Sequence, residues 1–145
     1  VRPCFAWLIY PLVDADITAW PSARLFARGP LLSRANVQDM IDHYVPDQAD
    51  RRDPRVSVLY AEGLDRMPPT YIATAGMDPI RDQGEAFAER LREAGVAVEL
   101  QRFPNLPHGF DLMLVEPEAE SATAATCTVL ARGLAAASAG VAHAG

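Results

Sequence analysis

The sequence has no lysine, few cysteines and no long apolar run. All 13 basic side chains are arginines, and the formal net charge is −6. The arginines are scattered and often stand beside acids, as in Asp50-Arg51-Arg52-Asp53, so we expect no nucleic-acid partner. No apolar run reaches the roughly 18 residues of a membrane span, and no secretory signal opens the chain. We therefore expect a cytoplasmic protein without a membrane span, whose partners are small molecules or proteins.

The sequence also offers little to bind a metal. Cys4 and Cys127 are too few for a disulfide framework and belong to no Cys-x-x-Cys pair. We interpret both as buried free thiols, with a disulfide as the less favoured alternative. His43 stands four residues after Asp39, but no further histidine or cysteine lies nearby, so a solvated or capping role is favoured over a metal ligand. We expect neither a metal nor an organic cofactor.

Hydrophobic patterns predict an α/β fold with parallel strands. Residues 4–12 form an apolar run that is typical of a strand buried on both faces. A second strand pattern covers 70–75, and apolar residues alternate with other residues over 96–102, as in a strand near a sheet edge. A helical pattern lies between these two strands. The three elements together predict a βαβ unit.

The helices have recognisable ends. Asp82 and Glu85 have the spacing of a capping box for the helix of the βαβ unit, and Gly95 is expected to end it. Ser33 is expected to cap an earlier helix that ends before Pro46. The apolar face of that earlier helix would consist of residues at helical spacing: Val37, Met40, Ile41 and Tyr44.

The C-terminal segment completes the predicted domain. Pro117 is expected to open the last helix, which should lose its regularity in the Ala- and Gly-rich segment from Ala135. We find no linker that would divide the chain. We therefore expect one domain over residues 1–138, followed by a flexible tail over 139–145.

An acid and a histidine each stand just past a predicted strand. Asp78 follows the strand at 70–75, and His108 follows the strand at 96–102. Ligands bind at the carboxyl ends of strands in open parallel sheets, so an ionised Asp78 could orient His108 as a general base. On these residues alone, an ordinary turn acid before Pro79 and a loop histidine bonded to backbone are an equally good interpretation.

Other acids are better explained by local structure. Asp82 is favoured as a helix cap over a catalytic acid. Asp14 and Asp16 follow the first strand, where a turn role is favoured over a place in a pocket wall.

Residues 67–110 contain five short motifs in sequence: Pro-Pro before a strand, Asp-Pro-x-x-Asp, a Gly-Glu-Ala-x-Ala helix, Leu-Arg-x-Ala-Gly-Val and His-Gly-Phe. Upstream, Leu8-Ile9-Tyr10-Pro11 and Asp53-Pro54-Arg55-Val56-Ser57 extend the pattern. In order and spacing, these motifs resemble the C-terminal part of the hormone-sensitive-lipase group of α/β-hydrolase esterases. The resemblance covers nearly the whole chain and implies a carboxylic ester hydrolase that acts on a small ester.

The resemblance also implies roles for single residues. Asp78 corresponds to the acid of the family's catalytic triad, and His108 corresponds to its base. Residues 14–66 would contribute part of a cap over the acyl pocket, and the strand over 96–102 would be able to pair across a dimer. Three apolar residues of the cap are candidates to line the pocket: Phe26, Leu31 and Leu32.

The nucleophile of that family is missing from this sequence. It would stand in a Gly-x-Ser-x-Gly turn between a strand and a helix. None of the five serines has this context: Ser22, Ser33, Ser57, Ser121 and Ser138. The family's His-Gly-Gly oxyanion segment is also missing, and Val1-Arg2-Pro3 leads straight into a strand pattern without an initiator methionine.

These absences predict the C-terminal half of an α/β-hydrolase, which supplies the acid and the base but is inactive by itself. Two alternatives stay open. The chain is either a non-catalytic binding or interaction module derived from this fold, or one half of a split esterase whose serine lies on a separate protein.

Overall fold

A parallel three-stranded sheet organises residues 3–113 and 115–142, which are the residues that the computed structural model describes. The strands are β1 (Ala6–Ile9), β2 (Thr70–Met77) and β3 (Val98–Pro107), in the spatial order β1-β2-β3. Both strand pairs are parallel. The predicted α/β class with parallel strands is therefore confirmed.

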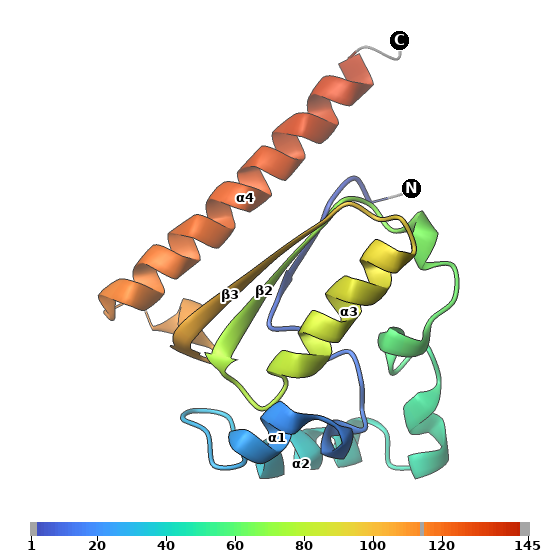
Figure 1. The fold of residues 1–145 in the computed structure, drawn as a ribbon, viewed down its shortest axis with the longest axis vertical. Coiled ribbons are helices and arrows are strands. Elements are labelled where there is room, and N and C mark those ends of the chain that lie inside the picture. The colour runs from blue at the N-terminus through green and yellow to red at the C-terminus, as the bar shows by residue number, and fades with distance from the viewer. Residues whose placement is uncertain (1–2, 114, 143–145) are drawn as a thin grey trace.

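Helices cover both faces of this sheet. Figure 1 shows α3 on one side of β2 and β3 and the long α4 on the other side, while α1 and α2 lie beyond the strand ends. The α-helices of the described chain are α1 (Pro21–Leu25), α2 (Arg34–Tyr44), α3 (Arg81–Glu93) and α4 (Pro117–Ala142). Short 3₁₀ helices complete the connections: Ile17–Ala19, Gln48–Arg52, Val58–Tyr60, Leu64–Arg66 and Phe110–Leu112.

The central strand β2 distributes its side chains between the two layers. Ile72 packs with Phe87 and Leu91 of α3, whereas Tyr71 packs with Val129 of α4. Adjacent strand residues point to opposite faces of a sheet, so one strand can contribute to both cores. Residues 70–76 are all buried, as this double coverage requires.

The first strand is shorter and less buried than the sequence predicts. The apolar run over 4–12 predicts a strand buried on both faces, but β1 covers four residues, all half-buried. Its only strand partner within the described residues is β2, so one edge of β1 is unpaired there. The prediction of buried thiols is wrong as well, because Cys4 before this strand and Cys127 on α4 are both free and exposed.

Helix α2 begins and ends as predicted. The Ser33 hydroxyl accepts a hydrogen bond from the Asn36 amide, and the Asn36 side chain accepts one from the Ser33 amide. The predicted apolar face is only half buried, since Met40 is 54% exposed and Tyr44 is 75% exposed. Both side chains border the pocket described below.

The capping box predicted for α3 does not form. Ile80 occupies the N-cap position without a side-chain cap, and the Asp82 carboxylate instead accepts from the Ser22 amide of α1. The end of the helix agrees with the prediction, because Gly95 follows the C-cap with a φ of 84°.

Helix α4 begins at Pro117, as predicted, but remains helical to Ala142 instead of losing regularity from Ala135. Alanine has the highest helix propensity of all residues, which explains the extension. Residues 143–145 of the predicted flexible tail lie outside the described residues, and the flexibility of 139–145 stays a prediction. In the part of the chain that is described, no helix is long and apolar enough to cross a membrane.

Candidate active site

Asp78 and His108 come together at the carboxyl ends of β2 and β3. Met77 and Pro107 are paired residues of these adjacent parallel strands, so the residue that follows each lies at the same sheet edge. Oδ2 of Asp78 lies 2.7 Å from Nδ1 of His108. The Asp78 side chain is fully buried, whereas that of His108 is 25% exposed. The structure thus pairs the two residues that the sequence singles out, and His108 is the member that reaches the surface.

Both carboxyl oxygens of Asp78 have a hydrogen-bond partner. Its second oxygen, Oδ1, accepts a hydrogen bond from the Ile80 amide at 2.9 Å. Because a carboxylate only accepts hydrogen bonds, Nδ1 of His108 carries the proton between the two side chains. The other ring nitrogen, Nε2, is then left with a lone pair that can accept a proton from a hydroxyl group.

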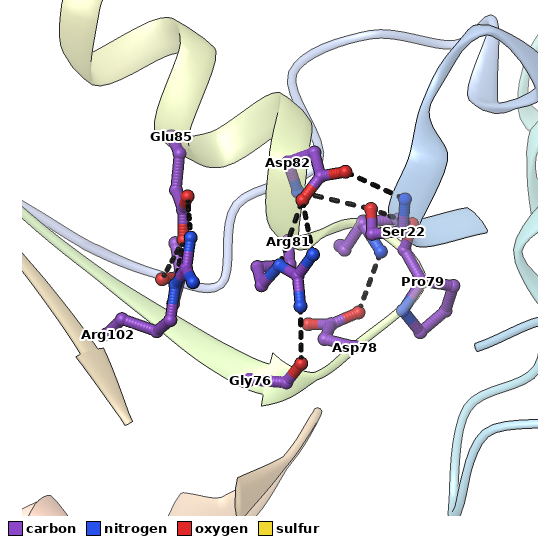
Figure 2. A network of polar contacts seen from close by, with 10 residues as sticks. Ser22, Gly76, Asp78, Pro79, Arg81, Asp82, Glu85 and Arg102 are labelled. Carbon is purple, nitrogen blue, oxygen red and sulfur yellow. Dashed lines mark hydrogen bonds and ion pairs between the residues drawn. The ribbon is translucent and has the colours of Figure 1, made fainter. Parts of the chain in front are cut away.

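A second polar network fixes the loop that carries Asp78. Figure 2 shows the guanidinium of Arg81 between the Gly76 carbonyl and the Asp82 carboxylate. Oδ2 of Asp82 accepts from the Ser22 amide at 2.7 Å, and the Ser22 hydroxyl donates to the Pro79 carbonyl at 2.9 Å. These bonds tie α1 to the loop between β2 and α3. Asp82 therefore helps to hold α1 against this loop, and it does not cap α3 as predicted.

Tyr10 also lies at this site, although it is not among the site residues predicted from the sequence. The centroid of its ring lies 4.2 Å from that of His108, at an interplanar angle of 51°. Its hydroxyl donates to the carboxylate of Asp111, three residues after His108. The only sequence signal for this contact is the Tyr-Pro step at the end of the first strand pattern.

An apolar pocket of about 490 Å³ opens beside His108. Its walls come from the end of β1, the loop before α2, α2 itself and the loop before α3. Besides His108, the lining residues are Ile9, Tyr10, Pro11, Leu12, Leu32, Val37, Met40, Ile41, Tyr44 and Ile80. The combination of largely apolar walls with a few polar groups, among them the His108 imidazole, is typical of small-molecule sites.

The three predicted pocket residues separate in the structure. Leu32 lines this pocket, but Phe26 and Leu31 are not among its lining residues. The Phe26 ring instead lies under the Arg81 guanidinium, 5.4 Å from its central carbon. Leu31 has a φ of 65° and is 71% exposed, so this turn directs its side chain to solvent.

Asp14 has the turn role that was favoured, and a further one. Its Oδ1 accepts from the Asp16 amide at 2.9 Å. Its Oδ2 accepts from the Trp20 indole at 2.9 Å and from the Tyr60 hydroxyl at 3.1 Å. Asp14 is buried, and its carboxylate connects Asp16, Trp20 and Tyr60 inside the segment 14–66.

His43 is exposed on α2, and its Nδ1 lies 2.7 Å from the Asp39 carbonyl oxygen. This backbone hydrogen bond raises the pKa of His43 above its ordinary value. The favoured local role is therefore the one observed. Across residues 3–113 and 115–142, no group of three or more histidine, cysteine or acidic side chains could hold a metal ion.

No serine hydroxyl of the described chain hydrogen-bonds to His108. Ser22 and Ser57 are buried and donate to backbone carbonyls, while Ser33 caps α2. Ser138 donates to the Leu134 carbonyl within α4. The arrangement contains the paired Asp78 and His108, but the serines of the described chain have other partners or lie on α4.

Comparison with known proteins gives consistent matches. Residues 1–112 match the family described as alpha/beta hydrolase fold. The chain is 44% identical over 110 residues to carboxylic ester hydrolase LipN of Mycobacterium tuberculosis, which is 74% of this chain and 29% of that protein. It is 37% identical over 134 residues to carboxylesterase NlhH of the same species, which is 90% of this chain and 42% of that protein.

A solved structure matches too. Carboxyl esterase 2 of the fungus Tuber melanosporum superimposes with a TM-score of 0.78 at 32% identity, over 84% of this chain and 42% of that one. The chain thus spans less than half the length of each of these proteins.

Proposed function

This chain belongs to the alpha/beta hydrolase fold family, and from that premise we propose that Asp78 and His108 are the acid and the base of a carboxylic ester hydrolase with a serine nucleophile. One observation carries the proposal. The 2.7 Å contact joins a fully buried carboxylate to Nδ1 of a histidine that is partly exposed beside an apolar pocket. This is the geometry that leaves Nε2 available as a general base.

The proposed chemistry follows from these positions. Nε2 of His108 accepts the proton of the serine hydroxyl as the serine oxygen attacks the ester carbonyl. Asp78 stabilises the imidazolium that forms, because its charge lies against Nδ1. His108 then returns the proton to the departing alcohol. In the second half, His108 activates water in the same way, which releases the acid and regenerates the serine.

The pocket beside His108 supports a small ester with an apolar acyl or alcohol group as the substrate. Its walls are largely aliphatic and aromatic, and Leu32 is the cap residue predicted from the sequence that lies among them. Apolar groups gain free energy when they leave water for such walls. We therefore assign substrate contact to Leu32, and not to Phe26 or Leu31.

The serine would come from sequence outside these 145 residues, since none of the five serines stands in a Gly-x-Ser-x-Gly turn. Without it, the 145-residue chain should hydrolyse no short aryl ester and should bind no fluorophosphonate probe at an enzyme-like rate. The upstream reading frame decides between one longer polypeptide and a split enzyme.

The decisive experiment uses the longest in-frame polypeptide that contains these residues. Its hydrolysis of p-nitrophenyl butyrate should fall at least about a thousandfold in His108→Ala, because the general base is lost. The matched control is His43→Ala, which removes an exposed histidine of α2 and should leave the rate unchanged. A polypeptide that hydrolyses the ester equally well with and without His108 would contradict the proposal.

Two broader expectations also belong to this proposal. A cytoplasmic location is supported by the two free cysteines, and fractionation of the producing cells tests it.

A dimer through residues 96–102 is supported by the position of β3 at one edge of the described sheet. Light scattering on the purified polypeptide tests the dimer, and a monomer mass at micromolar concentration would contradict it.

A further inference from the structure

We infer that Tyr10 and Asp111 form a clamp that holds the His108 ring in its orientation toward Asp78, which makes Tyr10 a positioning residue. The inference rests on the proposed role of His108 as a base. It adds two residues to the site. Tyr10 packs against the histidine ring, and Asp111 holds Tyr10 through one hydrogen bond.

The first part of the clamp is the aromatic contact. The Tyr10 ring lies 4.2 Å from the His108 ring and tilts by 51° against it. A separate restraint on His108 is the hydrogen bond from Nδ1 to Asp78. A histidine that is 25% exposed has room to rotate toward solvent. The tyrosine ring limits that rotation, because it occupies one side of the imidazole.

The second part holds the tyrosine itself. Its hydroxyl donates to Asp111, which lies in the 3₁₀ helix Phe110–Leu112 directly after the His108-Gly109 turn. The ring edge also packs against Phe110, with centroids 5.5 Å apart and planes at 80°. Tyr10 therefore binds the segment that follows His108, and the end of β1 and the histidine loop are held together.

The backbone of Tyr10 shows that this position is held from several sides. Its φ is 37°, a left-handed value that residues with a Cβ rarely adopt and that costs about 1 kcal/mol or more. Its amide donates to the Ala73 carbonyl of β2 at 2.7 Å. Strained backbone persists where surrounding contacts determine it, and it is concentrated at functional sites.

The protonation of Tyr10 fits its role as a donor. Burial raises the pKa of the Tyr10 hydroxyl well above its ordinary value, and the hydrogen bond to Asp111 and the nearby charges of Asp111 and Asp78 raise it further. The phenol therefore keeps its proton at neutral pH. It donates to Asp111 throughout the pH range in which a histidine base works.

The test measures the Nδ1 proton of His108 directly, by NMR of the ¹⁵N-histidine-labelled 145-residue chain. Tyr10→Phe keeps the ring but removes the bond to Asp111, so exchange of this proton with water should become about tenfold faster. Tyr10→Leu removes the ring as well, and the resonance should broaden beyond detection. Backbone amide protection in β2, measured on the same samples, should stay unchanged in Tyr10→Phe, which separates positioning from a general loss of stability.

Two sets of variants control the result. Asp111→Ala should match Tyr10→Phe, while Asp111→Asn retains an oxygen acceptor and should restore exchange to within about threefold of the unsubstituted chain. Tyr60→Phe removes the same hydroxyl from another tyrosine–aspartate bond, the one to Asp14, and should leave the His108 proton unaffected.

The outcomes separate this inference from the proposed function. Exchange in Tyr10→Phe within about twofold of the unsubstituted chain, or an equal acceleration in Tyr60→Phe, would overturn the clamp. Absence of a hydrogen-bonded His108 proton in the unsubstituted chain would overturn the Asp78 pairing and the clamp with it. If the exchange rates are as expected but the longer polypeptide does not hydrolyse esters, the clamp is supported and only the proposed hydrolase function is overturned.

Discussion

The backbone of Gly76 in β2 lies so close to Pro104 in β3 that a Cβ at residue 76 would stand 2.0 Å from the Pro104 carbonyl oxygen. The strand pairing is irregular at this point, with a register shift between Ala75 and Met77. Only glycine fits here without moving backbone. The contact lies two residues before Asp78, so it contributes to where the acid stands relative to His108.

Gly76→Ala should therefore destabilise the fold by about 3 kcal/mol, because the new methyl group meets backbone that cannot move aside like a side chain. The matched control is Gly84→Ala in α3, whose Cβ would meet the Thr74 methyl at an ordinary 3.4 Å. That change should be neutral or stabilising by about 0.5 to 1 kcal/mol, since alanine favours helix. Urea denaturation of both variants measures the difference, and equal stabilities would contradict the strand contact.

Asp78→Asn tests the orientation of the histidine. An asparagine can still accept from the Ile80 amide, so the melting temperature should change little. It cannot stabilise an imidazolium, and kcat of the longest in-frame polypeptide should fall by about three to four orders of magnitude. Asp53→Asn serves as the control. Asp53 accepts a hydrogen bond from Arg55, and its substitution should keep full activity. A small effect of Asp78→Asn on kcat would show that another acid supports the histidine.

Leu32 and Leu31 offer a matched pair of adjacent leucines, one in the pocket and one 71% exposed. Leu32→Trp should reduce kcat/KM for p-nitrophenyl hexanoate by about tenfold more than for the acetate, because the larger side chain takes acyl space. Leu31→Trp should change both substrates equally and weakly. If both variants reduce the hexanoate rate to the same extent, the pocket beside His108 does not hold the acyl group.

The pH dependence of stability should be visible at the alkaline end. Burial, and then the charge of Glu99, raises the pKa of Tyr71 from 10.0 to about 12. Its protonated form is therefore favoured in the folded state, so its contribution to stability is complete below pH 10 and is lost as the pH rises toward about 12. No lysine titrates in this range, because the sequence has none.

Tyr71→Phe removes this titration together with the hydrogen bond to Gln101. The variant should be less stable than the unsubstituted chain at pH 8, and the gap between their urea midpoints should narrow as the pH rises to about 11.5. A gap that stays constant over this range would show that the Tyr71 hydroxyl titrates alike in the folded and unfolded chain.

Much of the fold was predictable because its signals are local. The strand pattern at 70–75, the cap at Ser33 and the left-handed Gly95 each depend on neighbouring residues and correspond to observed structure. The pattern at 96–102 corresponds to a strand with other bounds, since β3 covers Val98–Pro107. The burial of the first strand and of the two cysteines was not predictable in this way. It depends on which elements pack against them, and residue spacing carries no information about that.

The candidate site was likewise predictable only in part, since its local features follow from the sequence and its contacts do not. The order of Asp78 and His108, each after a strand, follows from the sequence, and parallel strands bring their carboxyl ends to one edge. Their 2.7 Å contact depends on the pairing of Met77 with Pro107, which is a property of the assembled sheet.

The sequence by itself determined the class of fold and placed Asp78 and His108 each after a strand pattern, because hydrophobic periodicity and turn residues act over a few positions; the roles proposed for the two residues come from the family resemblance. Only the tertiary structure decided that Tyr10 lies against His108 and that Leu32 enters the pocket while Leu31 does not. These relationships join residues through packing between distant segments and through single backbone turns. Their free energies come from the folded arrangement as a whole, and no local pattern encodes them.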